Sequence, residues 1–222
     1  MVADAAPADD LLEECTEGAR IALASAGRNR DVWLAALALD GRIGRMVLGA
    51  SEPMLGQIRL AWWRDQLGQP ASERPQGDPL LDLIGSAWNG HEISLIALVD
   101  GWEAMLGEGP VPEADLSRFI DGRAALARGL AARLGEEASA AAAERAGAFW
   151  ARADIAGHAA HDAEREFALD HTLSSAPRLP RRLRPLAVIG GLARRSLRNR
   201  GAPMLGDRLS PLAALRLGLI GR

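Results

Sequence analysis

Pairs of carboxylates four residues apart are the groups in this sequence that could most directly do metal chemistry. Such a pair points the same way on a helix and can hold Mg²⁺ bridged to a diphosphate. The pairs are Asp9/Glu13, Asp10/Glu14, Asp162/Glu166 and Glu166/Asp170. Because the chain has 29 Asp and Glu residues, several pairs are expected by chance, and we assign none of them to a metal.

His158 and His161 form a second candidate group, with Asp154 and Asp162 four residues before and after His158. Imidazole and carboxylate groups at this spacing share one helix face and can coordinate a metal. A solvated helix face gives the same pattern, and we favour that interpretation. Phosphate-binding glycine loops and the common hydrolase motifs do not occur in the sequence. We therefore predict no catalytic residue and no bound metal, and we interpret the single Cys15 as a small buried residue.

The composition predicts helices as the elements that position these side chains. Alanine and leucine dominate, tyrosine is absent, and no stretch alternates as a strand would. We expect an all-α fold with a single domain over residues 1–222. Helices are predicted at 9–26, 31–48, 53–67, 79–88, 92–106, 113–134, 137–160, 163–173, 183–199 and 210–220.

Charge is unevenly distributed along the chain. The net charge is −3, but residues 177–222 carry eleven arginines against Asp207 alone, which gives +10 there and −13 elsewhere. This segment is predicted either to contact an anionic membrane surface peripherally or to pack against the acidic remainder, and we favour packing. The acidic remainder would repel nucleic acid, so we expect no nucleic-acid partner. The N-terminus has no secretory or transit pattern and no span is long enough for a bilayer, which predicts a cytoplasmic protein.

One pair of segments is more distinctive than the rest. Residues 34–40 read LAALALD, and residues 52–67 read EPMLGQIRLAWWRDQL, a helix with two adjacent tryptophans. This pair resembles the squalene/phytoene synthase family. A weaker likeness is found at 119–123 (FIDGR), 178–180 (RLP) and 183–186 (LRPL).

The resemblance implies an isoprenoid synthase-like helical bundle, here shortened, around a central cavity. Active members hold Mg²⁺ and the diphosphates of two prenyl substrates with two Asp-x-x-x-Asp motifs. Here the first motif reads Asp40-x-x-x-Gly44, and the acids of residues 157–166 are arranged differently. We therefore expect an inactive member, similar to the assembly factors of mitochondrial respiratory complex I and their α-proteobacterial relatives. The alternative is an active Mg²⁺-dependent prenyl transferase that uses displaced acids such as Asp162 and Glu166.

The resemblance also implies which residues bind a ligand. It implies a prenyl or lipid ligand in the central cavity, a protein client, and no cofactor unless the chain is active with Mg²⁺. We expect at least one of the two tryptophans to be a core anchor. We expect an acidic residue to hold Arg64, with Asp40 one candidate, because an unpaired buried charge is costly. The implied substrate-binding residues are Asp40, Arg59, Trp62, Trp63, Arg64 and Asp65.

Overall fold

The alanine- and leucine-rich sequence forms helices throughout the described part of the chain. The computed structural model describes residues 7–170, 178–205 and 215–218, and these contain no strand. The helices are α1 (Pro7–Glu14), α2 (Glu17–Leu23), α3 (Arg30–Leu48), α4 (Pro53–Gly68), α5 (Pro79–Ala87), α6 (Ile93–Glu103), α7 (Glu113–Arg133), α8 (Ala140–His158), α9 (Asp162–Leu169) and α10 (Arg184–Arg198). Short 3-10 turns at Gly27–Asn29, Ala71–Glu73, Glu137–Ser139 and Arg181–Leu183 precede α3, α5, α8 and α10.

Most predicted helices are confirmed within a few residues, but the single helix predicted at 9–26 is wrong. The chain turns at Cys15, and Thr16 begins α2 by accepting a hydrogen bond from the backbone N–H of Ala19 at 3.4 Å. A β-hydroxyl residue at this position is a common helix start. Part of the predicted helix 210–220 is confirmed at residues 215–218, and its remainder lies outside the described residues, as do residues 171–173 of the predicted helix 163–173.

The turn after α1 is packed directly onto α3. A Cβ added at Gly41 would lie 2.0 Å from the carbonyl oxygen of Glu14, so only glycine allows this approach. The contact brings the end of α1 against the middle of α3, beside Asp40.

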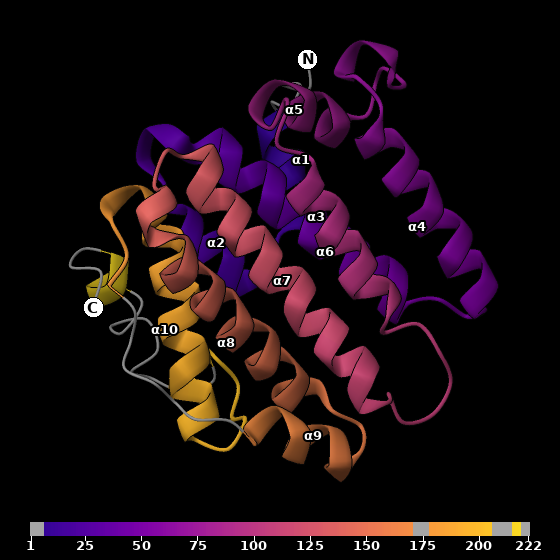
Figure 1. Cartoon of the computed structure of the whole chain (residues 1–222), viewed down its shortest axis with the longest axis vertical. Helices are drawn as coiled ribbons and strands as arrows, with labels where there is room; N and C mark the ends of the chain where they lie inside the picture. Colours follow the sequence, from indigo (N-terminus) through magenta and orange to yellow (C-terminus); the bar gives the residue numbers. More distant parts are fainter. Residues whose placement is uncertain (1–6, 171–177, 206–214, 219–222) are drawn as a thin grey trace, which may run out of the picture.

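The helices form two layers (Figure 1). In one layer α6, α7, α8 and α10 lie side by side, with α4 at the edge against α6. The second layer lies behind it and contains α1, α2, α3 and α5, with α3 contacting helices of both layers. No described helix is long and apolar enough to cross a membrane.

Glycines on two sides of α7 let it lie deep between its neighbours. A Cβ at Gly122 would be 2.8 Å from the carbonyl oxygen of Ala97 on α6. On the other side, a Cβ at Gly147 of α8 would be 2.6 Å from the carbonyl oxygen of Arg123. These close crossings draw the backbone of Arg123 into the centre of the bundle, which positions the site described next.

Candidate functional site

A pocket of about 240 Å³ lies between the C-terminal half of α3 and helices α6, α7, α8 and α9. Its buried end carries Asp40 and Arg123, each 2% exposed. The wall is mostly apolar and includes Leu48, Trp102, Met105, Phe119 and Ile155. The pocket therefore combines a charged floor with a wall suited to carbon chains.

The floor is a bidentate ion pair between α3 and α7. Nε and Nη2 of Arg123 donate to Oδ1 and Oδ2 of Asp40 at 3.0 and 3.1 Å. Nε1 of Trp102 on α6 donates to the same Oδ1 at 2.9 Å. Both oxygens of this buried carboxylate are therefore engaged by protein donors.

Arg123 also reaches α8. Its Nη1 donates to Oδ2 of Asp154 at 2.8 Å, so one guanidinium bridges two carboxylates. Three rings surround it, with centroids 4.2 Å (Trp150), 4.7 Å (Phe119) and 5.1 Å (Trp102) from Cζ. Ring faces stabilise a cation, and a fork of two hydrogen bonds suits arginine to a carboxylate.

Burial and pairing set the protonation states of the floor. Burial raises the pKa of Asp40, although Arg123 and Trp102 oppose this by stabilising the charged form. Burial also acts to raise the pKa of Asp154, but Arg123 and His158 outweigh it and the net pKa is lowered. The contact of His158 Nδ1 with Asp154 Oδ1 at 3.2 Å raises the pKa of His158 to about 9. His158 is therefore protonated at neutral pH.

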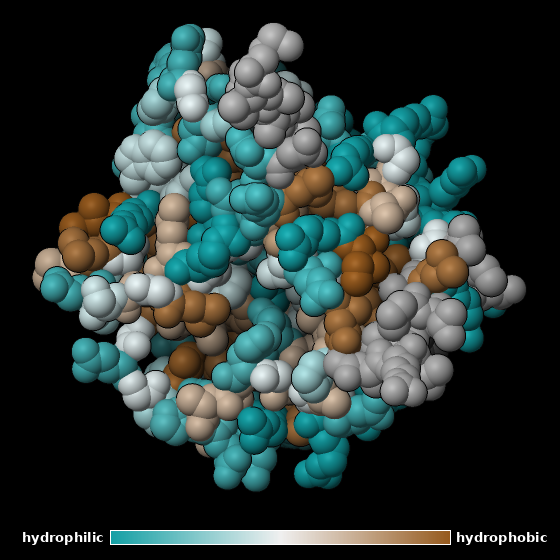
Figure 2. Space-filling view, turned by 180° about the vertical axis from the view of Figure 1, so that it is seen from behind, coloured by the Kyte–Doolittle hydropathy of each residue, from teal (hydrophilic) through white to brown (hydrophobic). Residues whose placement is uncertain are grey.

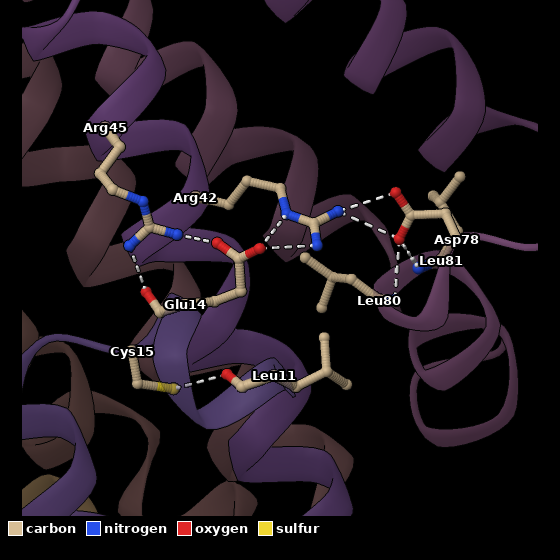
Figure 3. Close-up of polar contacts among 8 residues, drawn as sticks. All are labelled: Leu11, Glu14, Cys15, Arg42, Arg45, Asp78, Leu80 and Leu81. Atoms are coloured by element: carbon tan, nitrogen blue, oxygen red, sulfur yellow. Dashed lines mark hydrogen bonds and ion pairs between the residues drawn. The ribbon is translucent and has the colours of Figure 1, made fainter. Parts of the chain in front are cut away.

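The charged groups at the rim have partners too. Arg45 forms an ion pair with Glu14 and donates from Nη1 to its carbonyl oxygen at 2.7 Å, as Figure 3 shows. Glu164 of α9 accepts hydrogen bonds from the backbone N–H groups of Val111 at 2.8 Å and His161 at 3.4 Å. Each charged side chain that lines the pocket is thus satisfied within the chain.

The position four residues after Asp40 has no room for a carboxylate. A Cβ at Gly44 would lie 2.9 Å from Cζ2 of Trp102. Trp102 therefore fills the space beside Asp40 that a residue at position 44 would need.

Comparisons of the chain with protein-family models, curated proteins and solved structures find no match. The chemistry of the pocket is therefore inferred from the residues that line it.

Of the six predicted binding residues, only Asp40 lines the pocket. Trp63 is buried in the core of the bundle, while Trp62 is exposed and its ring meets that of Trp63 edge-on at 5.3 Å. Arg59 and Asp65 are exposed on α4. The structure does not bring these four residues to Asp40.

Arg64 is held by acidic residues as expected, but Asp40 as its candidate partner is wrong. Its Nη1 lies 3.1 Å from Oδ1 of Asp100 and 2.8 Å from Oε2 of Glu103, both on α6. Neighbouring helices α4 and α6 bring these charges together, whereas Asp40 points to α7.

Three residues of the site were not predicted as ligand-binding. Arg123 lies in segment 119–123, whose likeness to the family is weak, and no sequence pattern singled out Trp102 as a binding residue. Asp154 was identified together with His158, His161 and Asp162. Those three are exposed, as the solvated-face interpretation expects, but Asp154 and His158 both line the pocket. The detectable signal was the helical spacing that puts Arg123 on the same face as Phe119, Leu126 and Leu130, because an arginine on an apolar face needs a buried acid.

The displaced acids of the alternative hypothesis face solvent. Asp162 and Glu166 are both exposed on α9. Among the described residues, no group of three His, Cys, Asp or Glu side chains is arranged to hold a metal ion.

Cys15 is buried, as the sequence indicated. Its Sγ donates to the carbonyl oxygen of Leu11 at 3.6 Å (Figure 3). Burial, followed by the negative charge of Asp40, raises the pKa of the thiol to about 12. Such a thiol is a poor nucleophile.

A larger, more polar hollow of about 530 Å³ lies at the N-terminal end of α3. Two of its arginines serve the fold: Nε of Arg133 donates to the carbonyl oxygen of Ala87, and Nη1 of Arg182 to that of Leu134. These bonds satisfy helix-end carbonyls, so we place the functional site in the apolar pocket.

The basic segment 177–222 is described only in part. Arg194 is buried over the ring of Phe149, whereas Arg178 and Arg198 are exposed. Membrane contact through this segment stays a prediction.

Proposed function

We propose that this chain is a non-catalytic member of the squalene/phytoene synthase family, with an isoprenoid synthase-like bundle, that binds a neutral apolar chain and acts in assembly. The observation that carries this proposal is the Asp40–Arg123–Asp154 bridge. The guanidinium of Arg123 lies between the two carboxylates of the pocket floor.

The donor set of the pocket does not fit Mg²⁺. That ion needs near-octahedral oxygen ligands, usually from one or two carboxylates together with water and phosphate oxygens. Both oxygens of Asp40 already accept hydrogen bonds from Arg123 and Trp102. A buried guanidinium in direct contact would also repel a divalent cation. The site thus lacks the means to stabilise a departing diphosphate.

The balance of charge favours an uncharged ligand. Asp40, Arg123, Asp154 and protonated His158 sum to zero, and the two charged side chains at the rim, Arg45 and Glu164, also sum to zero. Small-molecule sites usually enclose about 300–1,000 Å³, so a pocket of about 240 Å³ has room for one short chain and not for two. A prenyl alcohol or the end of a lipid tail fits this description.

Catalysis is tested directly by diphosphate release. Purified protein is incubated with Mg²⁺ and farnesyl or geranylgeranyl diphosphate, and inorganic diphosphate is measured. We expect release equal to that of a protein-free control. Mg²⁺-dependent release that Asp40→Asn abolishes would overturn the proposal in favour of the transferase alternative.

Ligand binding is tested with farnesol by tryptophan fluorescence, since Trp102 lines the pocket. We expect saturable quenching that Ala159→Phe removes, because Ala159 lines the pocket. Ala141→Phe on exposed α8 surface is the matched control and should bind as the wild type does. No quenching, or equal quenching in both variants, would contradict binding in this pocket.

The assembly role rests on the family resemblance and is tested in the host cell. Deleting the gene is expected to lower NADH-driven quinone reduction in isolated membranes. Expressing the wild-type protein in the deletion strain should restore this quinone reduction. Unchanged complex I activity in the deletion strain would refute this part of the proposal.

A further inference from the structure

Helix α4 is apolar on two opposite sides. One side packs into the bundle through Gly56, Leu60, Trp63 and Leu67, which are buried. The other side faces solvent with Met54 (70% exposed), Ile58 (60%) and Trp62 (41%). These three are spaced by four residues, so they form one continuous stripe.

An outward stripe of this kind is unusual for a helix at the edge of a bundle. A helix that is apolar all round is normally buried all round, and contiguous exposed apolar patches mark interaction sites. Leu55 on α4 is also exposed, as is Leu48, a pocket-lining residue at the end of α3. Figure 2 shows exposed hydrophobic side chains at the edge where α4 lies, on the left of that reverse view. The described chain packs α4 against α6 and α3 and leaves this face uncovered.

The charges along the stripe follow a symmetric order. Glu52 stands at the N-cap of α4, Arg59 follows Ile58 and lies about 100° around the helix from it, and Asp65 lies in line with Ile58 near the C-terminal end; they are seven and six residues apart. All three are exposed, and none forms an ion pair with another described residue. The order is therefore negative, positive, negative in either direction.

We infer that the outward face of α4 is a docking surface for an amphipathic helix of a partner protein. The partner helix carries a basic residue at each end of its apolar stripe and an acidic residue midway. Its apolar side chains pack between Met54, Ile58 and Trp62, as one helix packs on another. This inference names the kind of partner for the proposed assembly role and rests on that proposal, but it does not require an occupied pocket.

The same charge order disfavours the two other occupants. A second copy of α4 would place like charges opposite one another at all three positions, because the order is symmetric. A bilayer would draw the carboxylate of Asp65, which lies in line with Met54 and Ile58, toward acyl chains at high cost. Helices that lie on membranes instead carry Lys and Arg around the apolar face.

The test uses two synthetic peptides of about 20 residues, long enough to form a helix. Both have the same leucine stripe; one carries lysine, glutamate, lysine along it, and the other carries glutamate, lysine, glutamate. Binding to the full-length protein is measured by calorimetry. We expect the first peptide to bind about tenfold more tightly, since three exposed charge pairs change sign.

Variants assign the binding to α4. Ile58→Asp should weaken binding of the first peptide about tenfold, whereas Ile93→Asp, at an even more exposed isoleucine on α6, should leave it unchanged. The triple variant Glu52→Lys, Arg59→Glu, Asp65→Lys should reverse the preference between peptides. Circular dichroism checks that each variant is folded.

Other outcomes would overturn the inference. If both peptides bind equally, or if Ile58→Asp binds the first peptide as tightly as the wild type does, the outward face of α4 is not a docking surface. Sedimentation of the wild type as a dimer that Ile58→Asp makes monomeric assigns the stripe to a second copy. Binding to phosphatidylcholine vesicles that Ile58→Asp abolishes assigns it to a membrane. Farnesol quenching of Ile58→Asp is measured in parallel, so loss of docking and loss of pocket binding are separated.

Discussion

Trp102 on α6 lies against Gly44 on α3, where a Cβ would come within 2.9 Å of its indole. The same indole donates a hydrogen bond to Asp40. The space next to Asp40 is thus occupied by an aromatic side chain from another helix, and Arg123 offsets the negative charge of the pocket floor.

Adding a side chain at Gly44 is expected to destabilise the fold. Gly44→Ala forces the Trp102 ring to move, and overpacking of this kind costs about 1–3 kcal/mol in unfolding free energy. Gly18→Ala is the matched control, since nothing lies within 4 Å of a Cβ there and the better helix propensity stabilises by up to ~1 kcal/mol. Urea unfolding measures both variants. If the two variants have the same unfolding free energy, the Trp102 ring moves aside without destabilising the fold.

Introducing a second acid four residues after Asp40 is not expected to create metal binding. In Gly44→Asp, Arg123 still holds Asp40 through two hydrogen bonds. We expect the melting temperature of this variant to be the same with and without millimolar Mg²⁺. A Mg²⁺-dependent increase confined to Gly44→Asp would mean that Arg123 can be displaced.

Removing the charge of Asp40 leaves Arg123 with one carboxylate in a buried site. Asp40→Asn is expected to lower the unfolding free energy by about 3 kcal/mol. Arg123→Met in the same chain removes the stranded cation, so the double variant should be more stable than the sum of the single losses predicts. Strictly additive losses in a urea double-mutant cycle would contradict the coupling.

The His158–Asp154 pair is expected to give a pH-dependent stability. The pKa of His158 is raised on folding, so its contribution is complete below 6.5 and is lost as the pH rises through about 9. The pKa of Asp154 is lowered, so its contribution is present above 3.8 and is lost in acid. The difference in unfolding free energy between wild type and His158→Ala should be largest between pH 3.8 and 6.5 and vanish above about pH 9.

The size of this difference is limited by solvent, because the His158 side chain is 77% exposed. We expect less than about 1 kcal/mol. A sharper measurement is the NMR titration of the ring, whose pKa should fall toward 6.5 in Asp154→Asn. A ring that titrates at the same pH in both proteins would disprove the pairing.

Asp78 combines two roles that two substitutions can separate. Its Oδ1 accepts from the backbone N–H groups of Leu80 and Leu81 at the start of α5, and its carboxylate pairs with Arg42 at 2.8 Å (Figure 3). Asp78→Asn keeps an N-cap and loses the charge, whereas Asp78→Ala loses both. We expect Asp78→Ala to cost about 1 kcal/mol more than Asp78→Asn. Equal melting temperatures would assign the whole effect to the ion pair.

The helices follow from the amino-acid sequence alone, because their signals are local. The polar and glycine-rich stretch after Gly68 and Pro at the first turn of α4 and α5 were readable within a few residues of each helix end. The break at Cys15 had one local signal, the N-cap residue Thr16, but the close contact between Glu14 and Gly41 at that break lies beyond local signals. Composition likewise predicted the all-helical class without placing one helix against another.

Which of these side chains form a site depends on how the helices pack in three dimensions. Asp40 and Arg123 are 83 residues apart in the chain and meet because glycines on α7 and α8 allow close packing. The packing also decides that Trp63 is an anchor and Trp62 a surface residue, since adjacent helical positions point about 100° apart. A helical sequence states which residues share a face, but the neighbour that covers that face is chosen by long-range packing of the whole bundle.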